Sequence, residues 1–230
     1  MGSARKHLIF DADDTLWENN IYFEQAFEHF CNYLNHSSMS PAQVHAVLDE
    51  IEVVNAKVHG YGSRNFARNL AQCFEHLAER QVSNTDLDAV QDFAYAILEQ
   101  PMQLIDGVAE TVAELSERHE LTLFTKGDPE EQRLKIDRSG LNSFFRHAEI
   151  VKEKNPSAYR ELAAARGFNP EITWMIGNSP KSDINPALAA GLAAVFVPHA
   201  RTWSLEREDL PETHGRLIRV QHIRELTHHF

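Results

Sequence analysis

Short apolar runs alternate with amphipathic stretches over much of the chain. The runs predicted to be strands are His7–Phe10, Leu121–Thr125, Ala148–Val151, Ile172–Gly177 and Ala193–Pro198. Apolar spacing near three and four predicts helices at Val108–Arg118, Glu130–Ser139, Ala158–Arg166 and Pro186–Ala190. Strands alternating with helices in this way indicate a parallel sheet with right-handed crossovers. The predicted fold class is therefore α/β, a Rossmann-like parallel sheet core flanked by helices.

The stretch from about Trp17 to Gln100, after the first strand, contains no strand-like alternation. Its pattern predicts helices at Tyr22–Leu34, Pro41–Val58, Ser63–Arg80 and Leu87–Gln100. An insert of this length inside one crossover is rarely a loop. We therefore predict a helical cap subdomain over residues 17–100, able to close over the strand ends, and a core domain of residues 1–16 and 101–230.

Composition and charge exclude several classes of partner. The chain has 230 residues, 43% of them hydrophobic, which is enough for one core and a smaller appendage. A formal net charge of −12 argues against nucleic acid or an anionic membrane as the main partner. No apolar run has the length of a membrane span, and no apolar signal core follows the N-terminus. We expect a cytoplasmic protein with no membrane partner.

Cysteines and histidines show no metal-binding spacing. Cys31 and Cys73 lie far apart without a Cys-x-x-Cys pattern, so buried reduced thiols are predicted. The histidines, such as His29, His45 and His119, are scattered without a His-Glu-x-x-His arrangement, and nearly all of the histidines are predicted to lie at the surface.

Two carboxylates follow the first predicted strand, in Asp11-Ala-Asp13-Asp14-Thr15. In an extended chain Asp11 and Asp13 point to the same side. Two negative charges this close are costly unless a cation or a raised pKa relieves them, which favours a magnesium-type ion. One carboxylate can then attack a phosphorus atom while the other handles a proton. A solvated acidic turn with Thr15 as a helix cap fits the same residues.

Polar residues also follow the second and third predicted strands. Thr125, Lys126 and Gly127 lie in a turn before a helix, where hydroxyl and backbone N–H groups can hold a phosphate. Ordinary capping chemistry accounts for that turn equally well. After the third strand, Lys152 and Lys154 both offer an ammonium that would offset the carboxylates. Lys154 is preferred because it lies next to the start of the following helix, and Lys152 stays an alternative.

The fourth predicted strand is followed by Asn178 and Asp183. A carboxylate and an amide carbonyl oxygen are both suitable ligands for octahedral magnesium. A capped helix start, with Ser182 or Asp183 as the N-cap, explains these residues as well.

All of these clusters lie at the carboxyl ends of predicted parallel strands, where open α/β sheets bind ligands. With its polar clusters in this order along the chain, the sequence resembles the phosphatase branch of the haloacid dehalogenase-like hydrolase (HAD) superfamily. The motifs that carry the resemblance are Asp11-x-Asp13-x-Thr15, Thr125, Lys154 and Gly177-Asn178-Ser179-x-x-x-Asp183, within a core from Lys6 to about Pro198. The helical insert looks like the C1-type cap of that family.

The sequence departs from the family pattern at two points. Many relatives have Gly-Asp where this chain has Gly177-Asn178, which weakens anionic metal coordination there. Lys154-Asn155-Pro156 replaces the commoner Lys-Pro.

The resemblance implies a magnesium-dependent phosphatase that hydrolyses a small phosphorylated metabolite through an aspartyl-phosphate. Asp11 would be the nucleophile, and Asp13 the acid and base, with a pKa nearer neutrality than that of a free carboxyl. Thr125 and Lys154 would complete the catalytic set. For Mg²⁺ the resemblance implies Asp11, Asp13 through its backbone carbonyl, Asn178 and Asp183, and for substrate it implies Thr125 and Lys154. The turn after the second strand adds Lys126 and Gly127 as candidate substrate-binding residues, and the predicted cap adds Arg64.

Other functions on the same fold stay open. A 2-haloacid dehalogenase has no leaving alkoxide to protonate, and its relatives lack the second aspartate, so Asp13 counts against it. A phosphomutase would share these residues and differ in how well the cap excludes water. A catalytically silent HAD-like binding protein also remains open because of Asn178.

Substrate choice is predicted to lie in the cap, where the turn His59–Asn65 places Arg64 or Tyr61 within reach of a substrate. An ordinary interhelical loop explains this turn as well. Trp203 and Glu206 resemble a Thr-Trp-x-x-Glu stretch of relatives, to which the sequence assigns no role. A homodimer stays open, because a cap helix can bury its apolar stripe within its own subdomain or against a second copy.

Overall fold

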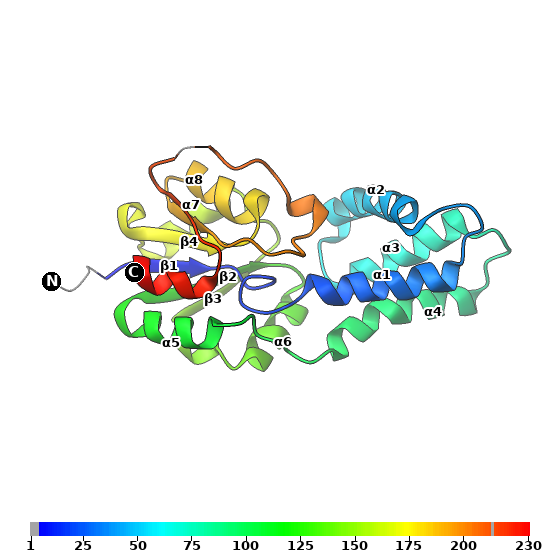
Figure 1. The fold of residues 1–230 in the computed structure, drawn as a ribbon, viewed down its shortest axis with the longest axis horizontal. Coiled ribbons are helices and arrows are strands. Elements are labelled where there is room, and N and C mark those ends of the chain that lie inside the picture. Colours follow the sequence, from blue (N-terminus) through cyan, green and yellow to red (C-terminus); the bar gives the residue numbers. More distant parts are fainter. Residues whose placement is uncertain (1–4, 213) are drawn as a thin grey trace. The chain divides into compact units, whose positions relative to one another are not determined.

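A computed structural model describes residues 5–212 and 214–230 (Figure 1). The chain clusters into two compact units. The core unit consists of residues up to Glu18 together with Met102–Phe230, and the helical unit consists of Asn19–Pro101. The boundaries of the helical unit lie close to the 17–100 insert predicted from the sequence.

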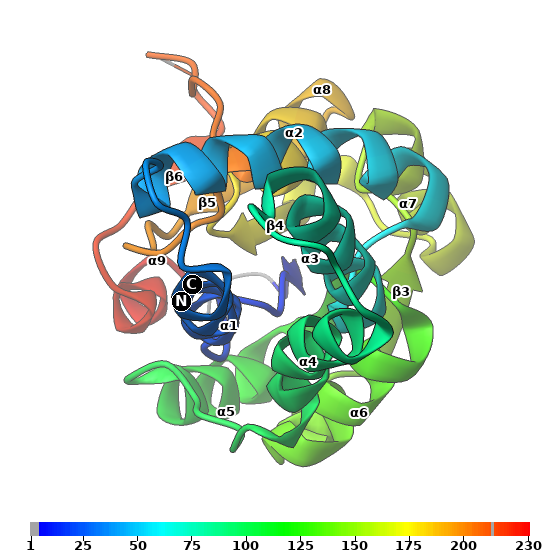
Figure 2. The same ribbon diagram turned by 90° about the vertical axis from the view of Figure 1, so that its right-hand side faces the viewer.

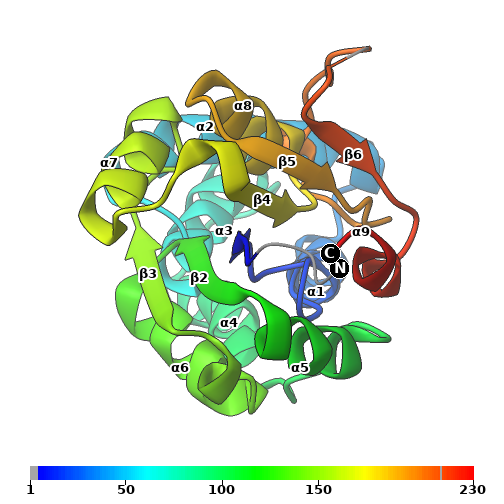
Figure 3. The same ribbon diagram turned by 90° about the vertical axis from the view of Figure 1, so that its left-hand side faces the viewer.

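The core unit is built on a parallel sheet with the strand order β3-β2-β1-β4-β5-β6, which Figure 3 shows. The strands are β1 (His7–Phe10), β2 (Glu120–Lys126), β3 (His147–Val151), β4 (Thr173–Gly177), β5 (Ala193–Phe196) and β6 (Leu217–Arg219). The α/β prediction is confirmed, and so are the strands expected from the apolar runs. β6 was not predicted, because three residues with polar neighbours leave no readable alternation.

The strand order reverses at β1, which lies between β2 and β4. The chain moves outward from β1 to β2 and β3, and then crosses to the other side of β1 to form β4. Ligands of open α/β sheets bind outside the carboxyl ends of the strands at such a reversal. The residues that directly follow β1, β2 and β4 are therefore the first place to look for a site.

Side chains of β1 alternate between two buried layers, as the period of a strand requires. Leu8 and Phe10 pack with Val112 and Ile136, whereas Ile9 packs with Tyr159 in a separate cluster. Figures 1 and 3 show α5 and α6 on one face of the sheet and α7 and α8 on the other. The helices of this unit are α5 (Val108–Arg118), α6 (Pro129–Ser139), α7 (Pro156–Arg166), α8 (Asn185–Ala189) and α9 (Leu226–His229).

The helical unit contains α1 (Asn20–Leu34), α2 (Pro41–His59), α3 (Ser63–Leu77) and α4 (Asn84–Tyr95), and a 3-10 turn at Ala96–Glu99. These are the helices that the apolar spacing predicts. In Figure 2, α3 lies beside α2 and α4. Phe30, Leu70 and Phe74 are fully buried in its core.

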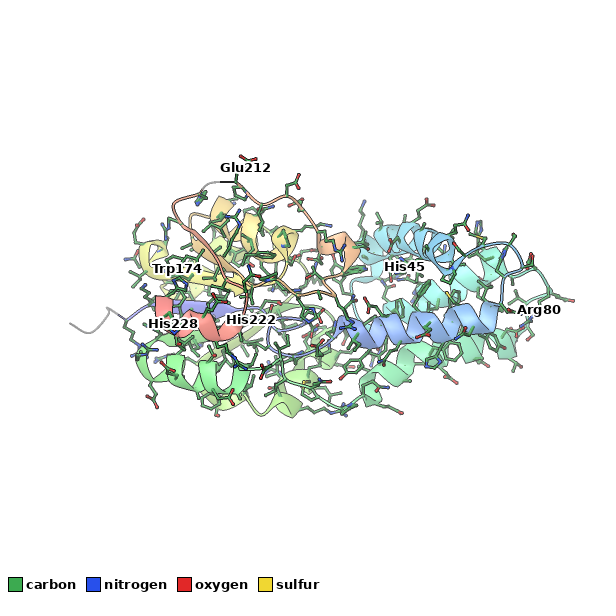
Figure 4. All side chains as sticks on the ribbon, in the orientation of Figure 1. His45, Arg80, Trp174, Glu212, His222 and His228 are labelled. Atoms are coloured by element: carbon green, nitrogen blue, oxygen red, sulfur yellow. The ribbon has the colours of Figure 1, made fainter. Side chains whose placement is uncertain are left out.

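Two helices of this unit, α2 and α4, begin with capping boxes. Ser40 caps α2 and Ser83 caps α4, each with the reciprocal contact from the third helical residue. Arg80, labelled in Figure 4, holds the carboxylate of Asp86 at 2.6 Å. The connection between α3 and α4 is therefore tied to the first turn of α4.

One histidine departs from the surface prediction. His119 is 2% exposed, and its Nδ1 accepts a hydrogen bond from the backbone N–H of Lys6 at 3.2 Å. Nε2 lies 3.1 Å from the carbonyl oxygen of Phe230, so the neutral ring links both ends of the described core unit. Burial lowers the pKa of His119. His222 and His228, labelled in Figure 4, are exposed as predicted.

Both cysteines are free, with Cys73 buried and Cys31 half-buried. Burial raises the pKa of the Cys31 thiol to about 11 and that of Cys73 to about 12, which keeps both protonated at neutral pH. Over residues 5–212 and 214–230, no helix combines the length and the apolar character of a membrane span.

Candidate active site

Asp11 is placed by the sheet itself. Its backbone N–H donates to the carbonyl oxygen of Ile176 at 2.9 Å, which extends the pairing of β1 with β4 by one residue. The chain then turns, with Asp14 at a φ of 59°, and the N–H groups of Thr15 and Leu16 donate to the carbonyl of Ala12. This turn brings the Thr15 hydroxyl back to the Asp11 carboxylate, at 2.9 Å from Oδ2.

Lys154 joins Asp11 to Asp183. Its ammonium donates to Asp11 Oδ1 at 2.5 Å and to Asp183 Oδ1 at 2.8 Å, and its side chain is 1% exposed. Burial by itself would lower the pKa of Lys154, but the charges of the two carboxylates outweigh burial and raise it. The ammonium is therefore permanently charged. Lys152 is exposed, so of the two lysines left open by the sequence, Lys154 is the one beside these carboxylates.

The surroundings of Asp183 disfavour its ionised form. Its side chain is buried, and burial together with the nearby charge of Asp11 raises its pKa, although Lys154 and the backbone N–H of Ser179 act in the opposite direction. One ammonium thus serves two buried carboxylates. A further cation would relieve the remaining negative charge.

Gly177 leaves the space that the Asp183 carboxylate fills. A Cβ atom at residue 177 would lie 2.3 Å from Asp183 Oδ2, which is well inside van der Waals contact. We expect Gly177→Ala to lower the free energy of unfolding by about 1–3 kcal/mol, measured by urea denaturation, because Asp183 or the end of β4 must move.

Gly215→Ala is the matched control for this prediction, because a Cβ atom there meets nothing within 4 Å. It should change stability by less than about 0.5 kcal/mol. Equal effects of the two substitutions would contradict the close approach of Asp183 to Gly177.

Asn178 points its amide nitrogen away from Asp11. Nδ2 donates to Thr202 Oγ1 at 3.0 Å, which leaves Oδ1 on the side of the Thr15 hydroxyl, at 3.2 Å. The backbone N–H of Asn178 also donates to Thr15 Oγ1. The Thr15 hydroxyl has one proton and two possible acceptors, Asp11 Oδ2 and Asn178 Oδ1, and it lies closer to Asp11. The side-chain oxygen of Asn178 can therefore still bind another ligand.

These residues fit a magnesium ion by the chemistry of their donor atoms. Asp11, Asp183 and Asn178 offer oxygen atoms, which Mg²⁺ prefers, and all three are linked through Lys154 or Thr15. Two carboxylates, Asp11 and Asp183, share the single ammonium of Lys154, so a bound cation would be favoured here.

A separate group of possible metal ligands lies in the loops that follow β1 and β5. Asp14, Glu18 and His199 offer atoms within 4.8 Å of one another. His199 Nε2 lies 3.3 Å from Glu18 Oε2, and Nδ1 lies 3.8 Å from Asp14 Oδ1. This arrangement is that of a histidine between two carboxylates, and sequence reasoning did not single it out.

Asp13 is held by a different set of partners from Asp11. Lys135 donates to both oxygens, at 3.0 and 2.8 Å, while Gln132 donates to Oδ2 and Trp17 Nε1 donates to Oδ1, each at 2.8 Å. Burial would raise the pKa of Asp13, but the charge of Lys135 and these hydrogen bonds outweigh it and lower the pKa. The expected pKa nearer neutrality is therefore wrong for this state of the site.

The turn after β2 shows the capping chemistry that was one of the two interpretations made from the sequence. Asp128 caps α6 by accepting from the N–H groups of Glu130 and Glu131, so the capping role is confirmed. Thr125 is buried at the end of β2 and donates to Gln132 Oε1 at 3.2 Å. Gly127 has a φ of +148°, and a Cβ atom there would lie 2.9 Å from Gln132 Nε2. A phosphate-binding role for Thr125 and Gly127 stays a prediction.

Lys126 is engaged by Glu206. Their side chains meet at 2.5 Å, and the same ammonium donates to Ser182 Oγ at 3.0 Å. Ser179 Oγ donates to the other oxygen of Glu206 at 2.6 Å. Burial would raise the pKa of Glu206, but Lys126 and the hydroxyls lower it. Glu206 thus ties the end of β2 to the loop after β4, a role that sequence alone did not assign.

Arg64 lies in the first turn of α3 in the helical unit and is exposed. Tyr61 precedes the same helix and is half-buried. A contact of either side chain with substrate stays a prediction.

A model of the haloacid dehalogenase-like hydrolases matches residues 5–191. The chain belongs to this family. A solved HAD-like family hydrolase from Xanthomonas campestris has 32% sequence identity and a TM-score of 0.83, over 97% of this chain and 89% of the other.

Named relatives of this HAD-like hydrolase include two phosphatases. The glyceraldehyde 3-phosphate phosphatase of Pyrococcus furiosus is 26% identical over 212 residues, which cover 88% of this chain and 85% of that protein. The phosphoserine phosphatase of Thermus thermophilus is 34% identical over 111 residues, covering 46% of this chain and 42% of that protein.

Sequence reasoning missed Gln132 and Lys135 in this hydrolase. They are three residues apart, so they share one face of α6, the helix that begins directly after the Thr125 turn. The available signal was a glutamine and a lysine next to Ile136 on one face of the helix that follows the Thr125 turn.

Proposed function

We propose that this HAD-like hydrolase is a magnesium-dependent phosphatase that cleaves a small phosphomonoester through an aspartyl-phosphate on Asp11. The observation that carries the proposal is the convergence of Asp11 and Asp183 on buried Lys154 at the carboxyl ends of β1 and β4. The relatives named as phosphatases support the same reaction class.

Asp11 is ready to act as the nucleophile. Lys154 donates to Oδ1 and the Thr15 hydroxyl donates to Oδ2, so the carboxylate is held in one orientation. One oxygen attacks the phosphorus atom in line, the new O–P bond forms, and the bond from phosphorus to the leaving oxygen breaks. The product of this step is a phosphorylated Asp11 and an alcohol.

Asp13 is the proposed proton carrier for both halves of the reaction. Asp13 enters the reaction in its protonated form, although Lys135 and its other partners favour the carboxylate in this state of the site. It gives this proton to the leaving oxygen, and the resulting carboxylate then takes a proton from the water that attacks the phosphorus atom of phosphorylated Asp11. The second O–P bond breaks, inorganic phosphate leaves, and Asp11 and Asp13 return to their starting states.

The surrounding groups stabilise negative charge on the transferring phosphoryl group. Lys154 supplies a fixed ammonium, and Thr125 a hydroxyl at the end of β2. Mg²⁺, held by Asp11, Asp183, Asn178 and the backbone carbonyl of Asp13, would supply further positive charge against the phosphate oxygens. Phosphoryl transfer depends chiefly on such positioning and electrostatics.

We further propose that residues 17–100 act as the cap and carry substrate selectivity, with Arg64 as the candidate contact to a phosphorylated metabolite. A guanidinium suits anionic or polar groups of such a substrate. The proposal draws support from the all-helical character of Asn19–Pro101 as a compact unit inserted between β1 and β2.

Metal removal tests the proposed function directly. With p-nitrophenyl phosphate as substrate, we expect release of inorganic phosphate in Mg²⁺ and at least about a hundredfold loss after EDTA treatment and buffer exchange. Added Mg²⁺ should restore the rate. Undiminished turnover after chelation would contradict the metal requirement, and halide release from 2-chloropropionate without phosphatase activity would favour the dehalogenase alternative.

A further inference from the structure

The acid and base of the proposed reaction, Asp13, is held by one face of α6. Both of its carboxylate oxygens accept from Lys135, at 3.0 and 2.8 Å, and Oδ2 also accepts from Gln132. Trp17, from the same loop as Asp13, donates to Oδ1. The side chains of Asp13 and Lys135 are 21% and 16% exposed, so this ion pair is largely removed from solvent.

Gln132 links Asp13 to a second residue of the proposed site. Its Nε2 donates to Asp13 Oδ2 at 2.8 Å, while its Oε1 accepts from the Thr125 hydroxyl at 3.2 Å. Only the amide nitrogen can donate to a carboxylate, so the two contacts agree on one orientation of the amide. Gln132 therefore sets the position of the Thr125 hydroxyl relative to the Asp13 carboxylate.

The placement of both side chains follows from the start of α6. Asp128 caps the helix and Pro129 is its first residue, which fixes where the helix begins. Gly127 has no side chain, and the space that a Cβ atom would take is filled by Gln132. Lys135 lies one turn further on the same face. The turn that follows β2 thus positions α6 so that it reaches the loop after β1.

We propose that Lys135 and Gln132 are positioning residues for Asp13, which hold its carboxylate in the orientation for proton exchange with the leaving group and with water. The inference rests on the proposed function, in which Asp13 moves that proton. Charge-assisted hydrogen bonds to both carboxylate oxygens leave Asp13 little rotational freedom. Neither Lys135 nor Gln132 needs to touch the phosphoryl group to affect the rate.

Leaving-group dependence separates this role from a structural one. Phenolate is a poor leaving group that benefits from a proton in the transition state, whereas 2,4-dinitrophenolate leaves without one. We expect Lys135→Met to lower kcat for phenyl phosphate at least about tenfold more than kcat for 2,4-dinitrophenyl phosphate, with KM changed less than about threefold. Lys135→Arg, which keeps a cationic donor, should recover part of the loss.

Arg133→Met is the matched control, because Arg133 is exposed on the same helix and the substitution removes the same charge. It should leave both esters within about twofold of the parent. Gln132→Leu is the second test variant and should show the same split between the two esters. Thermal unfolding of each variant reports whether the fold is kept.

A double-mutant cycle tests whether Lys135 acts through Asp13. In an Asp13→Asn background, Lys135→Met should change kcat for phenyl phosphate by less than about twofold, because the group that Lys135 positions is already lost. An equal loss on both esters, a gain of activity, or a full additional effect in the Asp13→Asn background would overturn the inference while leaving the phosphatase proposal intact. Absence of turnover by the parent protein would instead defeat the proposed function and this inference with it.

Discussion

Asp11→Asn is expected to lower kcat for an aryl phosphate by about ten thousandfold or more. An amide has no anionic oxygen to attack phosphorus, and loss of a covalent nucleophile commonly costs this much or more. The shape of the side chain is kept. The carbonyl oxygen can still accept from Lys154, while the amide nitrogen can donate to the Thr15 hydroxyl oxygen. The substitution should therefore remove the reaction without removing the fold. Steady-state release of p-nitrophenol in Mg²⁺ measures the effect.

Asp137→Asn is the control for this prediction. Asp137 is exposed on α6, and its substitution changes the net charge by the same amount. Its kcat should stay within about twofold of the parent value. If Asp11→Asn kept a rate within about tenfold of the parent, Asp11 would not be the nucleophile, and the convergence around Lys154 would have to be explained as a structural ion-pair network.

Lys154→Met is expected to lower the free energy of unfolding by about 3–5 kcal/mol. The substitution keeps much of the side chain volume but leaves Asp11 and Asp183 buried beside each other without their shared ammonium. Removing one partner of a buried ion pair is costly because the remaining charge cannot be solvated. Urea denaturation in metal-free buffer measures the loss, read from the midpoint at constant m-value.

Lys152→Met separates the effect of position from that of charge. Lys152 lies two residues earlier and is exposed, so its loss should change stability by less than about 0.5 kcal/mol. Added Mg²⁺ should recover part of the stability of Lys154→Met, because a cation bound to the freed carboxylates stabilises the folded state. A loss below about 1 kcal/mol in metal-free buffer would contradict the buried pairing of Lys154 with Asp11 and Asp183.

The strand pattern could be read from the sequence because β1, β2, β4 and β5 are short, mostly apolar and mostly buried runs, and the half-buried edge strand β3 ends in an apolar pair. Such runs differ sharply from the polar turns around them, and helices of the right length separate them. β6 could not be predicted, because it becomes a strand by pairing with β5 and its own three residues carry no pattern. His119 was misjudged for a related reason: its burial depends on Lys6 and Phe230, which lie more than a hundred residues away on either side in sequence.

The sequence by itself determined the fold class, the helical insert and the order of polar clusters after the strands, because these follow from local periodicity and from the rule that parallel strands end at one edge. Only the tertiary structure decided which side chains meet. In the structure, Lys154 rather than Lys152 contacts Asp11. Lys126 pairs with Glu206, and Asp13 accepts hydrogen bonds from Lys135 and Gln132. Each of these pairings spans 80 or more residues of sequence, so the distance between partners depends on strand register and helix placement. Local patterns carry no information about either.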